Sequence, residues 1–242
     1  MSERLILVPG IDGTGKLFYR QIPALERRFA VSAIALRDDA RTMAELVADL
    51  DRHITAVAGS GERVTVFGES FGGALALSYA LAHPERVARL VILNSFARYG
   101  SAAQLWLGCQ LLRITPWAVM GVVRRLNAPR MHSLNTEPAE IQRFLSLMRA
   151  TTRHGYLARM QMLRSYDVRA QLPSIAAPAL FLAADRDTLI PSIEQATLMS
   201  TLTPAGSMRI LEGHGHSCLI ASDMNLAEII TAWIGDTGGA RA

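Results

Sequence analysis

One stretch of the chain decides its fold: Arg63-Val64-Thr65-Val66-Phe67-Gly68-Glu69-Ser70-Phe71-Gly72-Gly73. A β-branched run ends there at a serine between glycines, and an alanine-rich run of helix formers follows up to Pro84. The spacing Gly68-x-Ser70-x-Gly72 suits a tight strand-to-helix turn, because side chains at either glycine would keep the strand and the helix apart. We interpret Ser70 as a nucleophile at a helix N-terminus, where backbone N–H groups favour developing negative charge. The alternative, that Ser70 only caps the helix, is disfavoured because strand, glycines and helix all fall where this chemistry needs them.

The composition is that of a globular protein with one substantial core. Half of the 242 residues are apolar and 19% are charged. The net charge of +4 is modest, and no zinc-ligand spacing or RNA-binding aromatic motif is present. We therefore expect no nucleic-acid partner, no metal and no cofactor.

The cysteines and the apolar runs indicate the compartment. Cys109 and Cys218 are far apart in the sequence and form no Cys-x-x-Cys, so free thiols in a reducing cytoplasm are expected. The apolar run at residues 5–8 is a strand, too short for a signal peptide. No apolar run reaches the roughly 18 residues of a membrane span. We predict a cytoplasmic protein without a transmembrane segment.

Strands and helices alternate on both sides of Ser70. Besides the strand that leads to Ser70, strands are predicted at residues 5–8, 29–36, 87–93, 179–184 and 207–211. Several of these runs are apolar throughout, which is typical of strands covered on both faces in a parallel sheet. Helices are predicted at residues 43–58 and 219–234, with a frayed tail at 235–242. The pattern indicates an α/β fold with about six strands in a largely parallel sheet, flanked by helices.

The alternation stops between residues 97 and 173, which are predicted to be helical throughout. Pro116, Pro129 and Pro138 should divide this segment into separate helices. We assign residues 1–96 and 174–242 to the core and residues 97–173 to an all-helical insertion. Arginine heavily outnumbers acid there, so the insertion carries either a solvated basic face or a surface for an acidic partner or anionic headgroup. Its larger apolar side chains could line a lipophilic acyl pocket or only fill a core: Trp106, Trp117, Met120, Phe144 and Met148.

The loop after the first strand, Pro9-Gly10-Ile11-Asp12-Gly13-Thr14-Gly15-Lys16-Leu17, allows two interpretations. Gly10-x-x-x-x-Gly15-Lys16 matches most of a phosphate-binding P-loop, but Leu17 stands where Ser or Thr must ligate magnesium. In the other interpretation, the glycine turn aims the backbone N–H of Ile11 at the point where Ser70 attacks. We favour this second interpretation because the turn around Ser70 is present and Leu17 lacks the hydroxyl that a P-loop needs to ligate magnesium.

A serine nucleophile needs a base and a group that orients the base. An acid follows the fifth predicted strand and a histidine follows the sixth, so both should lie at the same sheet edge as Ser70. Asp185 and Asp187 are both candidates for the acid, and we prefer Asp187 because its loop can turn the carboxylate toward an imidazole. His214 and His216 are both candidates for the base, and we prefer His216, which lies ahead of the closing helix.

With these motifs, the chain resembles the α/β-hydrolase fold superfamily over its whole length. The resemblance rests on the loop at residues 7–15, on Gly68-Glu69-Ser70-Phe71-Gly72, on Asp187 in Asp-x-Leu-Ile-Pro, on Gly213-x-Gly215-His216 and on the helical insertion, where that superfamily usually carries its cap. The loop is similar to that of small bacterial hydrolases and plant esterase/acyltransferase relatives. Two features depart from the superfamily's pattern. Pro9-Gly10 replaces the usual His-Gly, which removes a side chain that often braces the loop, and no antiparallel strand pair comes first.

The residues predict a serine hydrolase that acts on a small-molecule carboxylic ester. Ser70 would attack the acyl carbonyl, His216 would take its proton, and Asp187 would hold the imidazole. The backbone N–H groups of Ile11 and Phe71 would form the oxyanion hole. A serine where dehalogenases and epoxide hydrolases need an aspartate favours esters or thioesters.

Three other functions remain open. The chain could hydrolyse a thioester or a carrier-bound ester, or transfer the acyl group to an alcohol, with an acidic acyl carrier docked on the arginine-rich cap. It could be a ligand receptor on a hydrolase scaffold, although the presence of a serine, an acid and a histidine at the expected positions argues against this. It could also be a P-loop nucleotide-binding protein.

Overall fold

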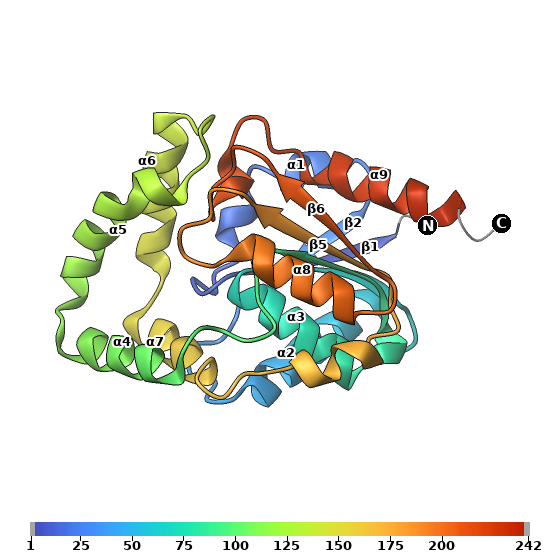
Figure 1. Cartoon of the computed structure of the whole chain (residues 1–242), viewed down its shortest axis with the longest axis horizontal. Helices are drawn as coiled ribbons and strands as arrows, with labels where there is room; N and C mark the ends of the chain where they lie inside the picture. The colour runs from blue at the N-terminus through green and yellow to red at the C-terminus, as the bar shows by residue number, and fades with distance from the viewer. Residues whose placement is uncertain (1–2, 240–242) are drawn as a thin grey trace.

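A six-stranded sheet forms the centre of the molecule. The computed structural model describes residues 3–239, and its strands pair in the order β2-β1-β3-β4-β5-β6, all parallel (Figure 1). The strands are β1 (Arg4–Val8), β2 (Ala30–Ala33), β3 (Val64–Glu69), β4 (Val87–Leu93), β5 (Ala179–Ala184) and β6 (Gly206–Leu211). The predicted α/β fold with about six parallel strands is confirmed.

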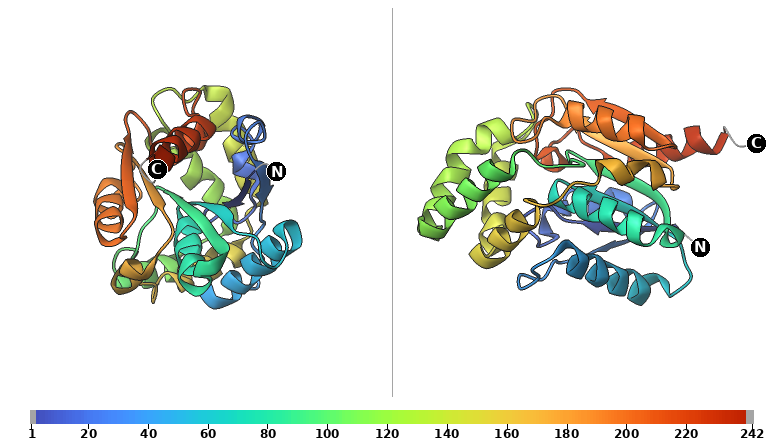
Figure 2. Two further views of the ribbon diagram at one scale, coloured as in Figure 1. Left: turned by 90° about the vertical axis from the view of Figure 1, so that its right-hand side faces the viewer. Right: turned by 60° about the horizontal axis from the view of Figure 1, so that its bottom comes forward.

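Helices cover both faces of the sheet (Figure 2). One apolar cluster joins the strands to α2 (Met43–Ala58), α3 (Phe71–Ala82) and α8 (Ser192–Leu202), and a second joins them to α1 (Ile22–Leu25) and α9 (Leu226–Gly239). Alternate residues of one strand enter different clusters: in β1, Ile6 and Val8 face the first, whereas Leu5 and Leu7 face the second. Burial on both faces explains the continuous apolar runs of the central strands.

The inserted helices gather at one end of the molecule. They are α4 (Ala102–Ile114), α5 (Trp117–Met131), α6 (Pro138–Leu147) and α7 (Arg153–Met162), and all lie between β4 and β5 in sequence. Figure 1 shows them at the end opposite the chain termini. In register, Val8 pairs with Gly68, Glu69 with Leu93, and Ala184 with Leu211. The strands therefore end at one common edge.

The structure differs from the sequence predictions at several element ends. The second strand stops at Ala33, because the chain then turns so that the Leu36 N–H donates to the Gly13 carbonyl at 2.7 Å. Pro129 does not divide the insertion, since α5 runs on to Met131. A proline in the last turn removes only one hydrogen bond of a long helix, so the helix tolerates it.

The closing helix also begins later than predicted. Residues 218–220 form a separate 3-10 turn, and α9 starts at Leu226, whose N–H donates to the buried Gln21 side chain at 2.9 Å. Residues 235–239 belong to this helix and are not a frayed tail, while the rest of that predicted tail, residues 240–242, lies outside the described residues. Within residues 3–239, no helix combines the length and the apolar character that a membrane crossing requires.

Candidate active site

Ser70 occupies a strained turn between β3 and α3. Its φ and ψ are 54° and −120°, a region that non-glycine residues rarely enter. The turn is anchored by the Ser70 N–H, which donates to the Leu93 carbonyl at 2.9 Å, and by the Ser95 hydroxyl, which donates to the Ser70 carbonyl at 2.6 Å. A Cβ at Gly68 would lie 2.4 Å from the Gly72 carbonyl oxygen, and a Cβ at Gly72 would lie 2.2 Å from that of Val8. Both glycines are therefore required by close backbone approach, as the spacing predicted.

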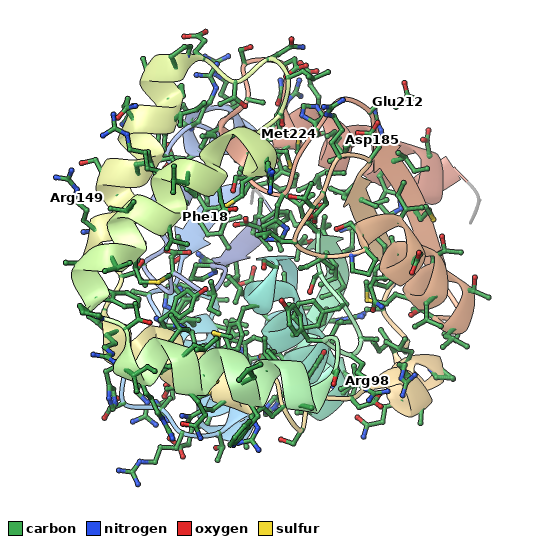
Figure 3. All side chains as sticks on the ribbon, turned by 60° about the vertical axis from the view of Figure 1, so that its left-hand side comes forward. Phe18, Arg98, Arg149, Asp185, Glu212 and Met224 are labelled. Carbon is green, nitrogen blue, oxygen red and sulfur yellow. The ribbon has the colours of Figure 1, made fainter. Side chains whose placement is uncertain are left out.

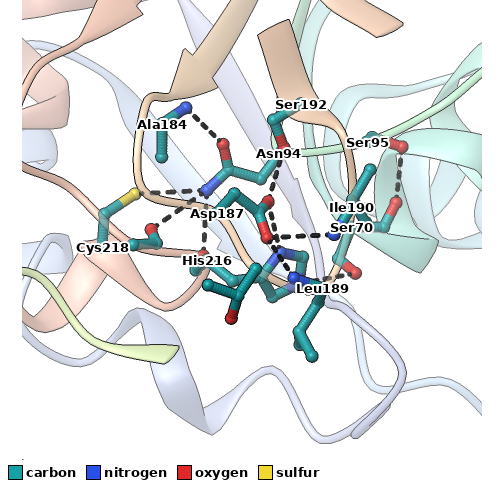
Figure 4. Close-up of polar contacts among 12 residues, drawn as sticks. Ser70, Asn94, Ser95, Ala184, Asp187, Leu189, Ile190, Ser192, His216 and Cys218 are labelled. Carbon is teal, nitrogen blue, oxygen red and sulfur yellow. Dashed lines mark hydrogen bonds and ion pairs between the residues drawn. The ribbon is translucent and has the colours of Figure 1, made fainter. Parts of the chain in front are cut away.

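The structure brings Ser70, His216 and Asp187 into one hydrogen-bonded chain (Figure 4). His216 Nε2 lies 3.1 Å from Ser70 Oγ, and His216 Nδ1 lies 2.7 Å from Asp187 Oδ2. The other candidates lie elsewhere: His214 Nδ1 is 2.9 Å from the Ser133 hydroxyl, and the Asp185 N–H donates to the Leu211 carbonyl. The geometry thus joins the preferred member of each pair to Ser70.

Asp187 is held as a carboxylate and tunes the imidazole. It accepts the backbone N–H groups of Leu189 at 2.9 Å and Ile190 at 3.1 Å, and the Ser192 hydroxyl. Burial opposes its ionisation, but these bonds and the imidazole outweigh burial and lower the pKa of Asp187. Burial likewise opposes the charged form of His216, yet the hydrogen bond and negative charge of Asp187 raise the pKa of His216 above its ordinary value. An imidazolium at this position is therefore stabilised.

Asn94, which directly follows β4, connects the loops that carry Asp187 and His216. It is fully buried with a φ of 46°, its Nδ2 donates to the His216 carbonyl at 2.9 Å, and its Oδ1 accepts the Ala184 N–H at 2.8 Å (Figure 4). Sequence reasoning missed this residue. The polar residue at the end of the apolar strand at 87–93 was the available signal.

The end of α5 and the segment between α5 and α6 form hydrogen bonds with the same two loops. The Ser133 hydroxyl contacts His214 and accepts the Gly215 N–H at 3.3 Å, and the Ser217 N–H donates to the Met131 carbonyl at 2.8 Å. On the acid side, the Thr188 hydroxyl donates to the Arg130 carbonyl at 3.0 Å. The insertion therefore helps to hold the loops of both Asp187 and His216.

The loop after β1 lies beside Ser70. A Cβ at Gly10 would lie 3.6 Å from Ser70 Cβ, which places the Ile11 backbone next to Ser70. Phe71 is the first residue of α3, and within residues 3–239 neither its N–H nor that of Ile11 donates to a protein group. The loop leads into a three-residue 3-10 turn, Lys16–Phe18, and not into the longer helix of a P-loop. The surroundings of this loop thus suit the oxyanion interpretation.

Arg159 of α7 holds this loop from the insertion. The side chain is only 1% exposed, and its guanidinium donates to the carbonyls of Ile11 at 2.9 Å and Asp12 at 3.2 Å. It also pairs with Asp38 at 3.2 Å. Sequence reasoning placed the arginines of the insertion on a surface, and no sequence pattern distinguished this buried one from the rest.

Ser70 opens on a cavity of about 270 Å³ between the sheet edge and the insertion. Most of its lining is apolar and comes from both the core and the inserted helices. Met120, Phe144 and Met148 line it, as one interpretation of the insertion expected. Trp106 does not, because α4 turns its other side inward and leaves this side chain 48% exposed. Trp117 packs against Tyr156 instead, with ring centroids 5.8 Å apart.

Two further carboxyl groups, Asp12 and Glu69, line the same cavity. Burial raises the pKa of Glu69 to about 7, opposed by the charge of His216 and assisted by the charges of Asp12 and Asp187. Burial also raises the pKa of Asp12, against hydrogen bonds from Thr14. Among the described lining residues there is no lysine or arginine to pair with an anion. In the part of the chain that the structure describes, no cluster of three or more His, Cys, Asp or Glu could hold a metal.

Known proteins show similarity along nearly the whole chain. A relative from Yersinia enterocolitica named "Putative carbamate hydrolase RutD" is 27% identical, over 99% of this chain and 90% of its own length. The crystal structure of a hydrolase from Pseudomonas aeruginosa is 25% identical, with a TM-score of 0.77 over 98% of this chain and 88% of that one. A thermophilic esterase from Thermogutta terrifontis superposes with a TM-score of 0.84 at 19% identity, over 98% of this chain and 90% of that one, which supports the fold.

A family model covers most of the chain. It is described as "Serine aminopeptidase, S33" and matches residues 32–223, which include the turn of Ser70, the inserted helices and the loops of Asp187 and His216. The solved structures that resemble the chain share the α/β-hydrolase fold. The chain therefore belongs to the serine aminopeptidase S33 family of α/β hydrolases.

Proposed function

We propose that this chain is a serine hydrolase that cleaves carboxylic esters through an acyl-enzyme on Ser70. The observation that carries the proposal is the chain of contacts from Ser70 Oγ to His216 at 3.1 Å and from His216 to Asp187 at 2.7 Å, facing an apolar cavity. Membership of a hydrolase family supports hydrolytic chemistry.

The reaction follows from the roles of these groups. His216 Nε2 takes the Ser70 proton as Oγ attacks the acyl carbonyl, and Asp187 stabilises the imidazolium. The N–H groups of Ile11 and Phe71 receive the oxyanion, and each such donor typically lowers the barrier by about 3 kcal/mol. His216 then protonates the leaving alcohol and activates a water molecule that hydrolyses the acyl-enzyme.

The cavity supports a neutral, lipophilic acyl group of small to moderate size. Its volume of about 270 Å³ lies near the lower end of ligand sites. The described lining residues include no lysine or arginine that would pair with a free carboxylate on the substrate. In this proposal residues 97–173 act as a cap that closes the acyl pocket. We also place the enzyme in the cytoplasm, supported by the two free thiols of Cys109 and Cys218.

A series of p-nitrophenyl esters of increasing acyl length tests the proposal. We expect kcat/KM to peak at a short to moderate acyl chain and to fall at least a thousandfold in Ser70→Ala. Ser60→Ala, which changes an exposed serine that does not line the cavity, is the matched control and should keep most of the activity. If Ser70→Ala and the native enzyme cleave the series equally fast, the proposal is wrong.

Carbamate hydrolysis is a second candidate, favoured by the similarity to the relative named for that activity. The same three residues could attack a carbamoyl carbon, but an anionic carbamate would meet Asp12 and Glu69 in the cavity. Ammonia release from carbamate, measured beside ester cleavage at equal enzyme concentration, separates the two. Faster turnover of carbamate than of every ester would favour the second candidate.

A further inference from the structure

The outer faces of α4 and α5 are apolar. Of the twelve exposed large hydrophobic side chains among the described residues, eight lie on these two helices. We call them the α4–α5 face: Trp106, Leu107, Leu111, Ile114, Val119, Val122, Val123 and Leu126. We propose that this face binds an anionic lipid surface, from which a lipophilic ester reaches Ser70.

The spacing on α4 shows that its outer side is a continuous apolar stripe. Leu105 and Cys109 are buried toward the core, whereas Leu107, Leu111 and Ile114 recur on the opposite side at helical spacing. Ile114 is 79% exposed, and Leu126 on α5 is 74% exposed. Figure 3 shows α4 and α5 across the front of the molecule with no other element over them. Apolar patches of this kind mark interaction sites.

The inserted segment that carries this face is strongly positive. Residues 98–167 contain ten arginines and three acidic residues, a net charge of +7, whereas the whole chain carries +4 and the remainder therefore −3. The lining of a groove between α5 and α6 includes Val122 together with Arg125 and Arg149. Among the described residues, no carboxylate forms an ion pair with either arginine. Figure 3 shows Arg149 directed away from the ribbon.

Helix α5 separates this face from the cavity of Ser70. Val123 is 39% exposed and also lines the cavity, together with Met120 and Asn127 of the same helix. A single helix therefore contacts both the outside and the acyl pocket. A lipophilic molecule held at the α4–α5 face lies one helix thickness from the pocket.

An anionic lipid surface fits both properties of the face. Acyl chains bury the apolar side chains while headgroups meet the arginines, as for helices that lie in a membrane interface. An acidic carrier protein would satisfy the arginines but leave Ile114 and Leu126 in water. A second copy would bring one insertion of charge +7 against another, which is unfavourable.

Co-sedimentation of the full chain with vesicles tests the proposal. We expect binding to vesicles of phosphatidylcholine with 25% phosphatidylglycerol at low salt, and much weaker binding to pure phosphatidylcholine or at high salt. Arg125→Glu/Arg149→Glu should lower the partition coefficient about 25-fold or more, and Ile114→Ser/Leu126→Ser should lower it at least tenfold. The matched controls are Arg27→Glu and Ile210→Ser, which change exposed residues of the core and should bind like the native chain.

The outcomes separate this proposal from the proposed function. Turnover of a short soluble ester should be unchanged in all four variants, so loss of vesicle binding does not depend on catalysis. Absence of binding to anionic vesicles at low salt overturns the proposal. Two other results, in a chain that does not bind vesicles, also overturn it. The first is a dimer in light scattering that dissociates in Ile114→Ser/Leu126→Ser. The second is salt-sensitive turnover of a carrier-bound ester that only Arg125→Glu/Arg149→Glu abolishes.

Discussion

Replacing Arg159 by Met tests how the insertion supports the chemistry. The guanidinium is buried, and it donates to the carbonyls of Ile11 and Asp12 in the loop beside Ser70. A Cβ at Gly13 would lie 2.6 Å from its Cζ, so the loop wraps tightly around the guanidinium. Met fills much of the volume but donates no hydrogen bond. The loop would therefore keep its packing and lose its anchor.

The expected magnitudes follow from these contacts. Hydrogen bonds to a charged group contribute about 1.5–3 kcal/mol each, and the part-buried Ile11 carbonyl and the buried Asp12 carbonyl both lose theirs. Asp38 is 36% exposed and can regain water, so its ion pair adds little. Arg159→Met also removes the cost of burying the guanidinium charge, which offsets part of this loss. The net decrease in the free energy of unfolding should be about 2–4 kcal/mol. If the Ile11 N–H moves out of line, kcat should fall by about 10²–10³-fold with little change in KM.

Urea unfolding and steady-state kinetics on a short soluble ester measure the two effects separately. Arg153→Met is the matched control, because Arg153 lies on the same helix and donates to the Leu112 carbonyl within the insertion. It should leave kcat within about twofold. Unchanged kcat in a destabilised Arg159→Met would refute the link between this arginine and the oxyanion hole. Unchanged stability as well would refute the role of its hydrogen bonds.

Three further predictions concern the pKa of His216 and the turn of Ser70. Because His216 must be neutral to act as base and its pKa is raised, kcat/KM of the native enzyme should fall as the pH drops through a midpoint above about 6.5. Asp187→Asn should move that midpoint to lower pH and reduce kcat by about 10⁴-fold. A pH–rate profile of both enzymes measures these effects. Glu69→Gln removes a second negative charge near the imidazole and should shift the same midpoint lower by a smaller amount, and a shift to higher pH would contradict the assignment. Gly72→Ala brings a Cβ to 2.2 Å of a backbone oxygen and should cost about 3 kcal/mol or more in thermal unfolding. Gly121→Ala, in open space within α5, should by contrast be neutral or stabilising.

The positions of the three central residues could be predicted because parallel strands end at one edge. Ser70 follows β3, Asp187 follows β5 and His216 lies in the loop after β6, so the order of strands alone brings their loops together. The glycine spacing around Ser70 likewise reflects local backbone geometry, which a short sequence records directly. These features depend on neighbours in sequence or on a regular sheet.

Arg159 and Asn94 could not be predicted, since each acts through contacts between distant segments. Arg159 meets a loop almost 150 positions earlier, and Asn94 meets one more than 120 positions later. Trp106 was among the expected pocket residues because α4 is apolar on both sides, and periodicity then does not indicate which side faces inward. For the same reason, the sequence could not predict that the residues of the α4–α5 face are exposed.

Intact-protein mass spectrometry after reaction with a fluorophosphonate tests the central claim most directly. Ser70, activated by His216, should gain one phosphonyl group, and peptide mapping should place it on the segment that contains Ser70. His216→Gln should slow the labelling at least a thousandfold, and Ser70→Ala should abolish it. A native chain that hydrolyses esters while Ser70 stays unlabelled, or that is labelled at another serine, would contradict the account.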